Sequence, residues 1–279
     1  MSCRRRSRVA TLQLLMAEAR LDAALAARGL ARSRTHAARL IADGLVMVDG
    51  APVVKVSARV RDDQIIAVAA SEHYVSRAAH KLVAALDAFE IDVAGRLALD
   101  VGASTGGFSQ VLLERGVWHI IALDVGHGQL ATPVRGDTRV TAVEGFNARF
   151  MTPTTLADAS GLRERPSLVV ADLSFISLPI VLPALVATVG READYVLLVK
   201  PQFEVGRTGI REGIVRDAGL RADAVAGVLW AAWDLGLPTA GVIASPIAGN
   251  AGNREYLAWF SHSAGTNPTE WLNTVEALG

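Results

Sequence analysis

Nine residues from Asp100 to Phe108 form the segment of this 279-residue chain whose residue types and spacing best suit ligand chemistry. A short apolar run ends at Asp100 and helical periodicity begins at Phe108, so the segment predicts a turn between a strand and a helix. Glycines let a backbone turn sharply and approach a ligand closely, and open α/β sheets bind ligands beyond the carboxyl ends of their strands. The residues that we expect to contact a ligand are Asp100, Gly102, Ser104, Thr105, Gly106, Gly107 and Phe108.

A second acid indicates a nucleoside-type ligand. Asp124 ends the next apolar run, 24 residues after Asp100, where an acid can accept hydrogen bonds from ribose hydroxyls. An acid at the start of the loop suits the cationic sulfonium and amino groups of S-adenosylmethionine and would repel a pyrophosphate. The spacing Asp-x-Gly-x-Ser-x-Gly-Gly also departs from G-x-G-x-x-G. We therefore expect S-adenosylmethionine as cofactor, with an NAD-dependent enzyme as an alternative.

Polar residues also follow three later apolar runs, at the same expected edge of the sheet. Asn147 and Asp172 are candidates for cofactor binding, and Lys200 ends a run just before a proline. Asp172 has the alternative role of a helix cap, and Lys200 that of a lysine whose charged end reaches solvent at the edge of the sheet. Phe175 either stacks beside an adenine or fills the core. Lys81 and Glu255, taken singly, have the pattern of surface charges.

The elements that would position these residues alternate between strand and helix. Apolar runs between helical segments indicate a doubly wound α/β domain with a mostly parallel sheet, a Rossmann-like fold. The expected strands cover residues 97–100, 119–124, 140–143, 168–172, 195–200, 239–244 and 255–261, and the expected helices cover 77–89, 108–115, 178–188 and 217–235.

A smaller unit precedes this domain. Helical patterns before Gly29 and over residues 34–43, the second capped by Ser33, lead into short strands at 45–48, 53–54 and 65–68, with a turn at Asp49-Gly50. We expect a leader at 1–19, a small α+β domain at 20–69, a linker at 70–76, the Rossmann-like domain at 77–264 and a tail at 265–279.

The net charge of zero is unevenly distributed. Residues 1–75 carry 12 Lys and Arg against 7 Asp and Glu, and the rest carry 16 against 21. A basic module joined to an acidic one suggests that the first binds a polyanion, and phosphate contacts give affinity without sequence information. The candidate RNA-binding residues are Arg20, Arg28, Arg32, Arg34, Arg39, Lys55 and Arg77.

Composition restricts the remaining classes. The single cysteine, Cys3, cannot form an internal disulfide or a metal cluster. No apolar run approaches the ~18 residues of a membrane helix, and the basic start is followed by too short an apolar stretch for a secretory signal. We expect a cytoplasmic protein, a monomer, with no metal and no membrane partner.

Two resemblances sharpen these expectations. The segments Arg20-Leu21-Asp22, residues 29–34 and residues 42–50 resemble the S4-like RNA-binding domain. The motifs at 76–82, 100–108, 124–130, 171–177, 198–204 and 252–256 resemble those of the TlyA family of ribosomal RNA 2′-O-methyltransferases, often labelled haemolysins. The resemblance implies a catalytic set of Lys81, Asp172, Lys200 and Glu255. It also implies S-adenosylmethionine as cofactor and cytidine 2′-hydroxyls of 16S and 23S ribosomal RNA, in the ribosomal subunits, as substrate.

The chemistry is consistent with that set. A ribose 2′-hydroxyl is a weak nucleophile that loses its proton as it attacks the methyl group, so positioning and a nearby base supply the rate. Our hypothesis is that Lys200 accepts or steers this proton, with like charge on Lys81 favouring the neutral amine, while Asp172 and Glu255 orient the lysines. A membrane-active haemolysin and a non-catalytic ribosome-binding protein are the alternative functions.

Overall fold

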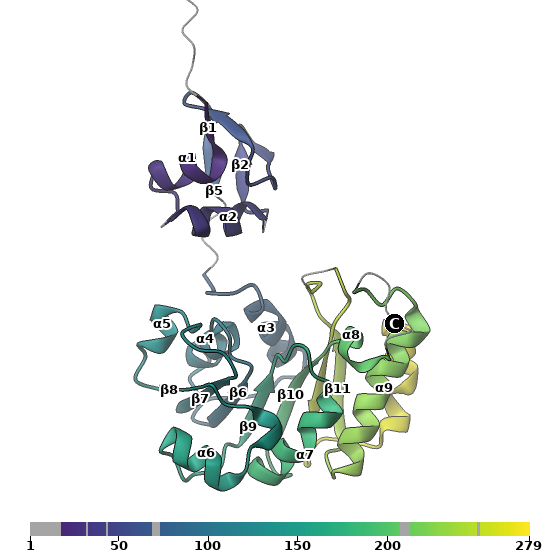
Figure 1. Ribbon diagram of the computed structural model, residues 1–279. Coiled ribbons are helices and arrows are strands. Elements are labelled where there is room, and N and C mark those ends of the chain that lie inside the picture. Colours follow the sequence, from purple (N-terminus) through teal and green to yellow (C-terminus); the bar gives the residue numbers. More distant parts are fainter. Residues whose placement is uncertain (1–17, 32, 43, 69–72, 207–212, 250–251) are drawn as a thin grey trace, which may run out of the picture. The chain divides into compact units, whose positions relative to one another are not determined.

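The computed structural model describes residues 18–31, 33–42, 44–68, 73–206, 213–249 and 252–279. The chain divides into two compact units, Met1–His73 and Tyr74–Gly279 (Figure 1). Each unit has hydrophobic clusters of its own, so the two are described separately.

The first unit packs two helices against short strands. Leu21, Leu25 and Ile41 are fully buried in its cluster, and Ser33 Oγ accepts a hydrogen bond from the backbone N–H of His36, as the expected helix cap does. The elements are β1 (Glu18–Arg20), α1 (Leu21–Ala27), α2 (Arg34–Ala42), β2 (Val46–Val48), β3 (Ala51–Pro52), β4 (Arg59–Arg61) and β5 (Ile66–Val68).

The strands of this unit form two sheets. The positive φ angles of Asp49 and Gly50 make the predicted tight turn between β2 and β3, and β5 pairs with β2 on its other side. Strand β1 pairs with β4 in a separate two-stranded sheet that the sequence did not predict. Only Val60 of β4 is buried, so neither strand has enough apolar residues to produce a recognisable pattern.

The second unit is built on a seven-stranded sheet of order β11-β12-β10-β9-β6-β7-β8. Strands β10, β9, β6, β7 and β8 are parallel, and β12 runs antiparallel to both β10 and β11. The predicted Rossmann-like α/β class is thereby confirmed. The strands are β6 (Leu97–Val101), β7 (His119–Asp124), β8 (Val140–Glu144), β9 (Leu168–Ala171), β10 (Asp194–Val199), β11 (Thr239–Ala244) and β12 (Tyr256–Phe260).

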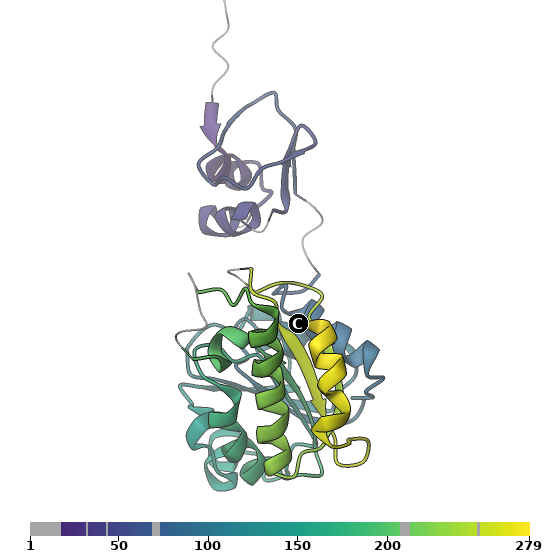
Figure 2. The same cartoon turned by 90° about the vertical axis from the view of Figure 1, so that its right-hand side faces the viewer.

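Helices cover both faces of this sheet (Figures 1 and 2). One hydrophobic cluster lies under α3 (Ala79–Ala88) and α4 (Gly107–Glu114), with Val134 of α5 (Thr132–Arg135) at its edge. The cluster on the other face is covered by α6, α7, α9 and α10. The remaining helices are η1 (Ala148–Phe150), α6 (Pro153–Ser160), α7 (Leu178–Val189), α8 (Pro201–Glu204), α9 (Ala218–Asp234), η3 (Pro268–Trp271) and α10 (Leu272–Leu278).

The unit boundaries differ from the expected ones at three places. Glu18 and Ala19, expected in the leader, belong to β1, while residues 1–17 lie outside the described residues. Tyr74 to Ser76, expected in the linker, belong to the second unit. The expected tail forms η3 and α10, and its Val275 is buried in the hydrophobic cluster. An apolar residue that packs back onto α9 makes this segment part of the domain.

The order of the strands creates a crevice at one edge of the sheet. The chain passes from β6 to β7 and β8 on one side, and then returns to β9 and β10 on the other. Val101 of β6 pairs with Ala171 of β9, so the loops that follow these two strands diverge at the switch point where ligands of such sheets bind. The glycine loop and Asp172 follow these same two strands.

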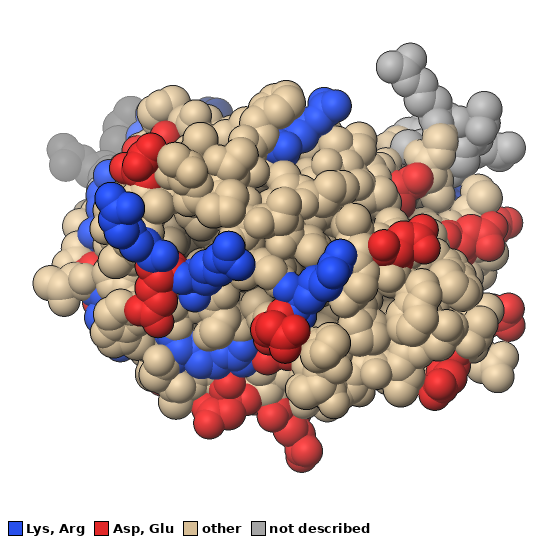
Figure 3. All heavy atoms as spheres, turned by 90° about the horizontal axis from the view of Figure 1, so that it is seen from below, with Lys and Arg blue, Asp and Glu red and all other residues tan. Residues whose placement is uncertain are grey.

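The opposite edge of the sheet, seen from below, mixes charges of both signs (Figure 3). There Arg96, just before β6, pairs with Asp194 at the start of β10 at 2.7 Å. Among the described residues, no helix is both long and apolar enough to span a membrane.

Candidate active site

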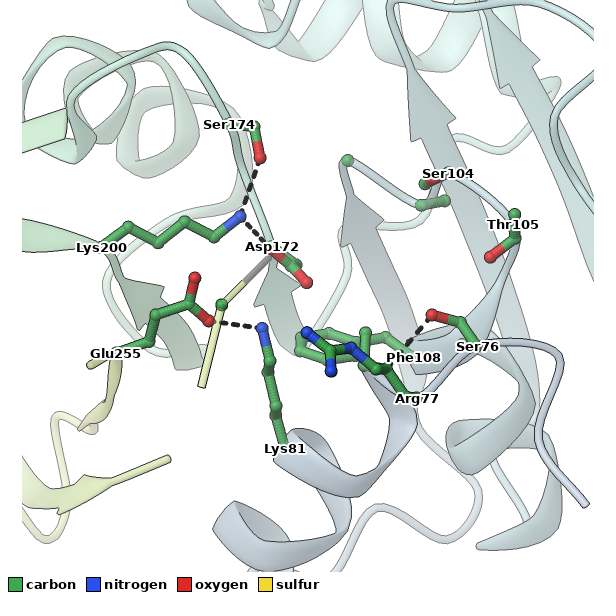
Figure 4. Close-up of a pocket in the computed structure, with 15 residues that line it drawn as sticks. Ser76, Arg77, Lys81, Ser104, Thr105, Phe108, Asp172, Ser174, Lys200 and Glu255 are labelled. Carbon is green, nitrogen blue, oxygen red and sulfur yellow. Dashed lines mark hydrogen bonds and ion pairs between the residues drawn. The ribbon is translucent and has the colours of Figure 1, made fainter. Parts of the chain in front are cut away.

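Four charged residues, Lys81, Asp172, Lys200 and Glu255, meet at the carboxyl edge of the sheet and are called the charged quartet below (Figure 4). Lys81 comes from α3, Asp172 and Lys200 directly follow β9 and β10, and Glu255 directly precedes β12. The structure thus brings together all four residues that the family resemblance implied.

The quartet is arranged as two ion pairs. Lys200 Nζ lies 2.6 Å from Asp172 Oδ1, and Lys81 Nζ forms an ion pair with Glu255 Oε2. Lys81, Lys200 and Glu255 are 6%, 8% and 4% exposed, and charges so deeply buried persist only when they are paired and hydrogen-bonded. The surface-charge alternative for Lys81 and Glu255 is therefore wrong, as is the solvent-reaching alternative for Lys200.

Ser174 is a member of the site that sequence reasoning missed. Its Oγ accepts a hydrogen bond of 2.8 Å from Lys200 Nζ, so the amine has two fixed acceptors (Figure 4). Ser174 stands two residues after Asp172, inside a motif already singled out. Nothing local in the sequence, however, shows whether Ser174 or Ser177 of this motif faces a lysine; the lysine that Ser174 binds is 26 positions away.

The glycine loop is shaped by close contacts within the chain. A Cβ on Gly102, whose φ is +82°, would lie 2.7 Å from the carbonyl oxygen of Asp172. A Cβ on Gly107 would lie 2.9 Å from Cβ of Ser76. These glycines let the loop pass beside the end of β9 and the segment before α3, which brings the glycine loop next to the charged quartet.

Asp100 lies fully buried beneath this loop. Ser109 donates a hydrogen bond of 2.6 Å to its Oδ2, while its buried Oδ1 has no hydrogen-bond partner among the residues that the structure describes. Burial raises the pKa of this carboxyl to about 7, and the nearby charges of Asp172 and Asp124 add to the rise. An acid with an unsatisfied oxygen in an acidic surrounding favours a cationic ligand nearby, which fits the sulfonium and amino groups of S-adenosylmethionine.

Asp124 is held rigidly at the end of β7. Its Oδ2 accepts the backbone N–H of Ser104 at 2.8 Å, and its Oδ1 accepts that of Gly126 at 2.7 Å. A carboxylate has about four lone-pair sites, so each oxygen keeps acceptor capacity for a ribose hydroxyl. The side chain lines a cavity, and its hydrogen bonds to a ribose stay a prediction.

Two cavities adjoin at the switch point. The cavity around the charged quartet measures about 230 Å³, and the neighbouring one, which Asp124 lines, measures about 480 Å³. They share Gly102, Ser104, Asp172 and Ser174. A small-molecule pocket of the second size holds a nucleoside, so a group on that nucleoside would reach the quartet across the shared residues.

Of the other predicted cofactor residues, five line one of the two cavities, whereas Asp100 and Gly106 line neither. Thr105, Gly107 and Phe108 line the cavity of the quartet. Asn147 and Phe175 line the larger cavity, where Asn147 also caps η1 by accepting the backbone N–H of Arg149 at 3.0 Å. Gly106 packs closely against Val134, since a Cβ at this position would lie 2.9 Å from Cγ1 of Val134.

Phe175 does not fill the core. Its side chain is 92% exposed, its φ is +66°, and its ring centroid lies 5.4 Å from that of Phe203. A bulky residue in this left-handed region costs about 1–3 kcal/mol unless the surroundings hold it there. The core alternative is therefore wrong, and stacking beside an adenine stays a prediction.

The candidate RNA-binding residues of the first unit have different surroundings. Arg20 and Arg34 both bind the buried carboxylate of Asp22, each at 3.0 Å. Arg28 donates to the backbone carbonyls of Gln64, Arg61 and Asp62. Arg39 and Lys55 are exposed, and Arg32 lies outside the described residues.

Arg77 belongs to the second unit and lies at the mouth of the charged quartet's cavity (Figure 4). Its Nη2 donates to the carbonyl oxygen of Ala248 at 3.1 Å, 171 positions along the chain. An exposed guanidinium at this place can meet a phosphate entering the cavity.

Comparison with known proteins gives likenesses over most of the chain. Residues 74–262 match the family of FtsJ-like methyltransferases, and residues 19–66 match the S4 domain. The 16S/23S rRNA (cytidine-2′-O)-methyltransferase TlyA of Mycobacterium tuberculosis is 53% identical over 244 residues, 86% of this chain and 89% of the relative. Hemolysin A of Brachyspira hyodysenteriae is 38% identical over 242 residues, 86% of this chain and 99% of the relative.

A solved structure agrees with these likenesses. The putative hemolysin from Streptococcus thermophilus has a TM-score of 0.72 at 35% sequence identity, and the match covers 94% of this chain and 95% of that one. The resemblance inferred from the motifs is therefore confirmed. With an S4 unit followed by a domain that matches over most of its length, this chain belongs to the FtsJ-like methyltransferase family and, within it, to the TlyA proteins.

Proposed function

We propose that the protein transfers a methyl group from S-adenosylmethionine to the ribose 2′-hydroxyl of cytidine in ribosomal RNA, acting in the cytoplasm on 16S and 23S RNA. The observation that carries the proposal is the pair of fixed acceptors around Lys200, beside a nucleoside-sized cavity. The M. tuberculosis relative, whose name states this activity, supports the choice of substrate.

The chain's own groups fit this reaction. The cofactor, when bound, supplies an electrophilic methyl group and needs no metal for the transfer. Asp124 would hold the ribose of the cofactor. Asp100 lines neither cavity, so its carboxyl would act on a cationic group of the cofactor only at a distance, from beneath the glycine loop. Phe175 and Asn147 would bound its adenine in the larger cavity.

Lys200 is the group that handles the proton. In the ion pair with Asp172 the amine is an ammonium, so Lys200 would first release a proton to solvent and then, as a neutral amine, accept the 2′-hydroxyl proton as the oxygen attacks. Asp172 and Ser174 already lie where they stabilise the ammonium that forms again. Acceptors fixed in advance need no reorganisation during the reaction. Lys81 and Glu255, as a closed pair, form the opposite wall and orient the hydroxyl.

The first unit would deliver the RNA. Arg20, Arg34, Arg39 and Lys55 offer positive charge to phosphates, and Arg77 offers it at the cavity mouth. The opposite edge of the second unit, with charges of both signs, is less suited to a polyanion (Figure 3).

The test is to incubate the protein with S-adenosylmethionine carrying a labelled methyl group and with separated, unmodified ribosomal subunits. We expect label in 16S and 23S RNA, at cytidines that become resistant to alkaline cleavage on their 3′ side. Absence of RNA label with a cofactor-binding protein would overturn the proposal. Lysis of liposomes by the same preparation would favour the haemolysin alternative.

A further inference from the structure

Glu204 ties together the two loops that carry Asp172 and Lys200. It is the last residue of α8, four positions after Lys200. Its Oε2 accepts the hydroxyl of Ser177 at 2.6 Å, and its Oε1 accepts the backbone N–H of Leu178 at 3.0 Å. Both donors stand at the start of α7, which follows the Asp172 loop.

This cap comes from a distant segment, whereas two other helices are capped locally. Thr152 caps α6 and Asp217 caps α9, each from the position directly before its helix. Ser177 holds that position before α7 and makes no such bond to its own helix. A serine at this position commonly caps its own helix, but here the carboxylate of Glu204 accepts the bonds at the start of α7 instead.

The hydrogen bonds of Glu204 to Ser177 and Leu178, called the Glu204 tie, lie at one end of a strained segment. On one side Lys200 binds Ser174, and on the other Glu204 binds Ser177. Phe175 lies in the chain between Ser174 and Ser177, with φ +66°, and its ring is next to that of Phe203 in α8. Such a backbone conformation persists only when its surroundings fix it, and the two ties on either side provide that restraint.

Glu204 lines neither of the two cavities, so it does not touch the reacting groups. The side chain is partly buried, and this burial raises the pKa of its carboxyl. Both carboxylate oxygens of Glu204 accept hydrogen bonds from the start of α7, so the side chain acts on that segment.

We propose that Glu204 is a positioning residue that holds residues 174–177 so that Ser174 stays on the amine of Lys200. This proposal rests on the proposed function for its activity readout. Losing the tie frees the segment, and Lys200 loses one of its two fixed acceptors. Because small misplacements of catalytic groups cost up to about 100-fold in rate, the loss should appear in kcat.

The experiment compares Glu204→Ala, Glu204→Gln, Ser177→Ala and the double variant Ser177→Ala/Glu204→Ala, with Glu192→Ala as a control for removing an exposed glutamate. Kcat for methylation of ribosomal RNA and Kd for S-adenosylmethionine are measured for each. We expect Glu204→Ala to lower kcat by about 10- to 100-fold, with Kd changed less than about threefold. Glu204→Gln keeps an acceptor for Leu178 and should recover most of the rate.

Coupling separates positioning from a general loss of stability. If Glu204 acts through Ser177, the double variant is no slower than Glu204→Ala alone, because the interaction can be lost only once. Full kcat in Glu204→Ala, equal loss in Glu204→Gln and Glu204→Ala, or additive losses in the double variant would each overturn the proposal. If Glu204→Ala does not fold, Glu204→Gln and Ser177→Ala give the same comparison.

A second readout needs no activity. Hydrogen exchange of the Leu178 amide should quicken in Glu204→Ala and remain slow in Glu192→Ala. An unchanged rate would overturn the tie even if the wild-type protein methylates no ribosomal RNA. If the Leu178 amide exchanges faster in Glu204→Ala but the wild-type protein methylates no ribosomal RNA, the contacts of Glu204 are supported and only the methylation reaction is rejected.

Discussion

Lys200 Nζ lies 2.6 Å from Asp172 Oδ1, while the other buried lysine, Lys81, is taken by Glu255. The chain has 28 basic residues, of which only Lys55, Lys81 and Lys200 are lysines. An arginine cannot lose its proton in a protein, whereas a lysine can. Two of the three lysines therefore lie in the charged quartet, where an arginine could not replace them as proton acceptors.

Replacing Lys200 by arginine should abolish most of the methyl transfer. Lys200→Arg keeps a cation for Asp172 but removes the group that can accept a proton, so we expect a rate about 10²–10⁴-fold lower, as for Lys200→Met. Calorimetry should show S-adenosylmethionine still bound to both. Near-normal transfer by Lys200→Arg would assign Lys200 to charge and orientation alone.

Breaking the Lys81–Glu255 pair should destabilise the second unit. Lys81→Met leaves Glu255 buried and unpaired, which costs about 3–5 kcal/mol of unfolding free energy. Urea unfolding followed by tryptophan fluorescence reports this unit, because all five tryptophans lie in it.

Two further variants serve as controls for the unfolding free energy of Lys81→Met. Lys81→Met/Glu255→Leu removes both charges and should recover most of the lost stability while staying inactive. Arg115→Ala opens the exposed pair with Asp87 and should cost less than about 1 kcal/mol. Equal losses for the buried and the exposed pair would contradict the expected effect of burial.

Asp100 should make the second unit less stable as the pH rises. Burial raises its pKa to about 7, against about 4 in an unfolded chain. Between these values the folded chain keeps a proton that the unfolded chain has released, so stability falls with increasing pH. The contribution is complete below about pH 4 and is lost as the pH rises through about 7.

The comparison with Asp100→Asn isolates this group together with its coupling to Asp124 and Asp172, since the titrations of more distant groups are common to both proteins. From pH 5 to pH 8 the wild type should lose about 2 kcal/mol of unfolding free energy relative to the variant. Urea unfolding at the two pH values measures the difference. Parallel pH profiles would show that Asp100 titrates normally.

Asp22 should strengthen RNA binding although it is an acid. Its side chain fixes Arg20 and Arg34 together, and the two guanidinium groups hold the pKa of its carboxyl at about 2. Asp22→Asn makes the unit more positive, yet we expect about tenfold weaker binding of ribosomal RNA, because charged hydrogen bonds of this kind contribute on that scale. Filter binding at fixed salt measures the change.

Asp63→Asn is the matched control, since Asp63 also binds an arginine, Arg61, but in an exposed pair. It should leave affinity unchanged or raise it slightly. Tighter binding by Asp22→Asn would mean that charge, not the fixed placement of Arg20 and Arg34, governs the contact.

The sheet was predictable from sequence because its strands are buried on both faces and are therefore continuous apolar runs, as in residues 119–124. The glycine loop and Asp124 were predictable because strand ends fix where ligands bind. The contacts of Ser174 and Glu204 were not, since each joins segments 26 or 27 positions apart through side-chain direction alone. Strands β1 and β4 were missed because three residues with little buried apolar surface leave no periodic pattern.

The 174 positions between Lys81 and Glu255 have a consequence for timing during synthesis. The described elements of the first unit are complete at Val68, and domains fold in order as the chain emerges. At usual elongation rates, the 187 further residues to Glu255 take roughly 10–40 s. A nascent chain therefore has every element of its first unit well before it can form the charged quartet, which also needs Glu255, directly before β12.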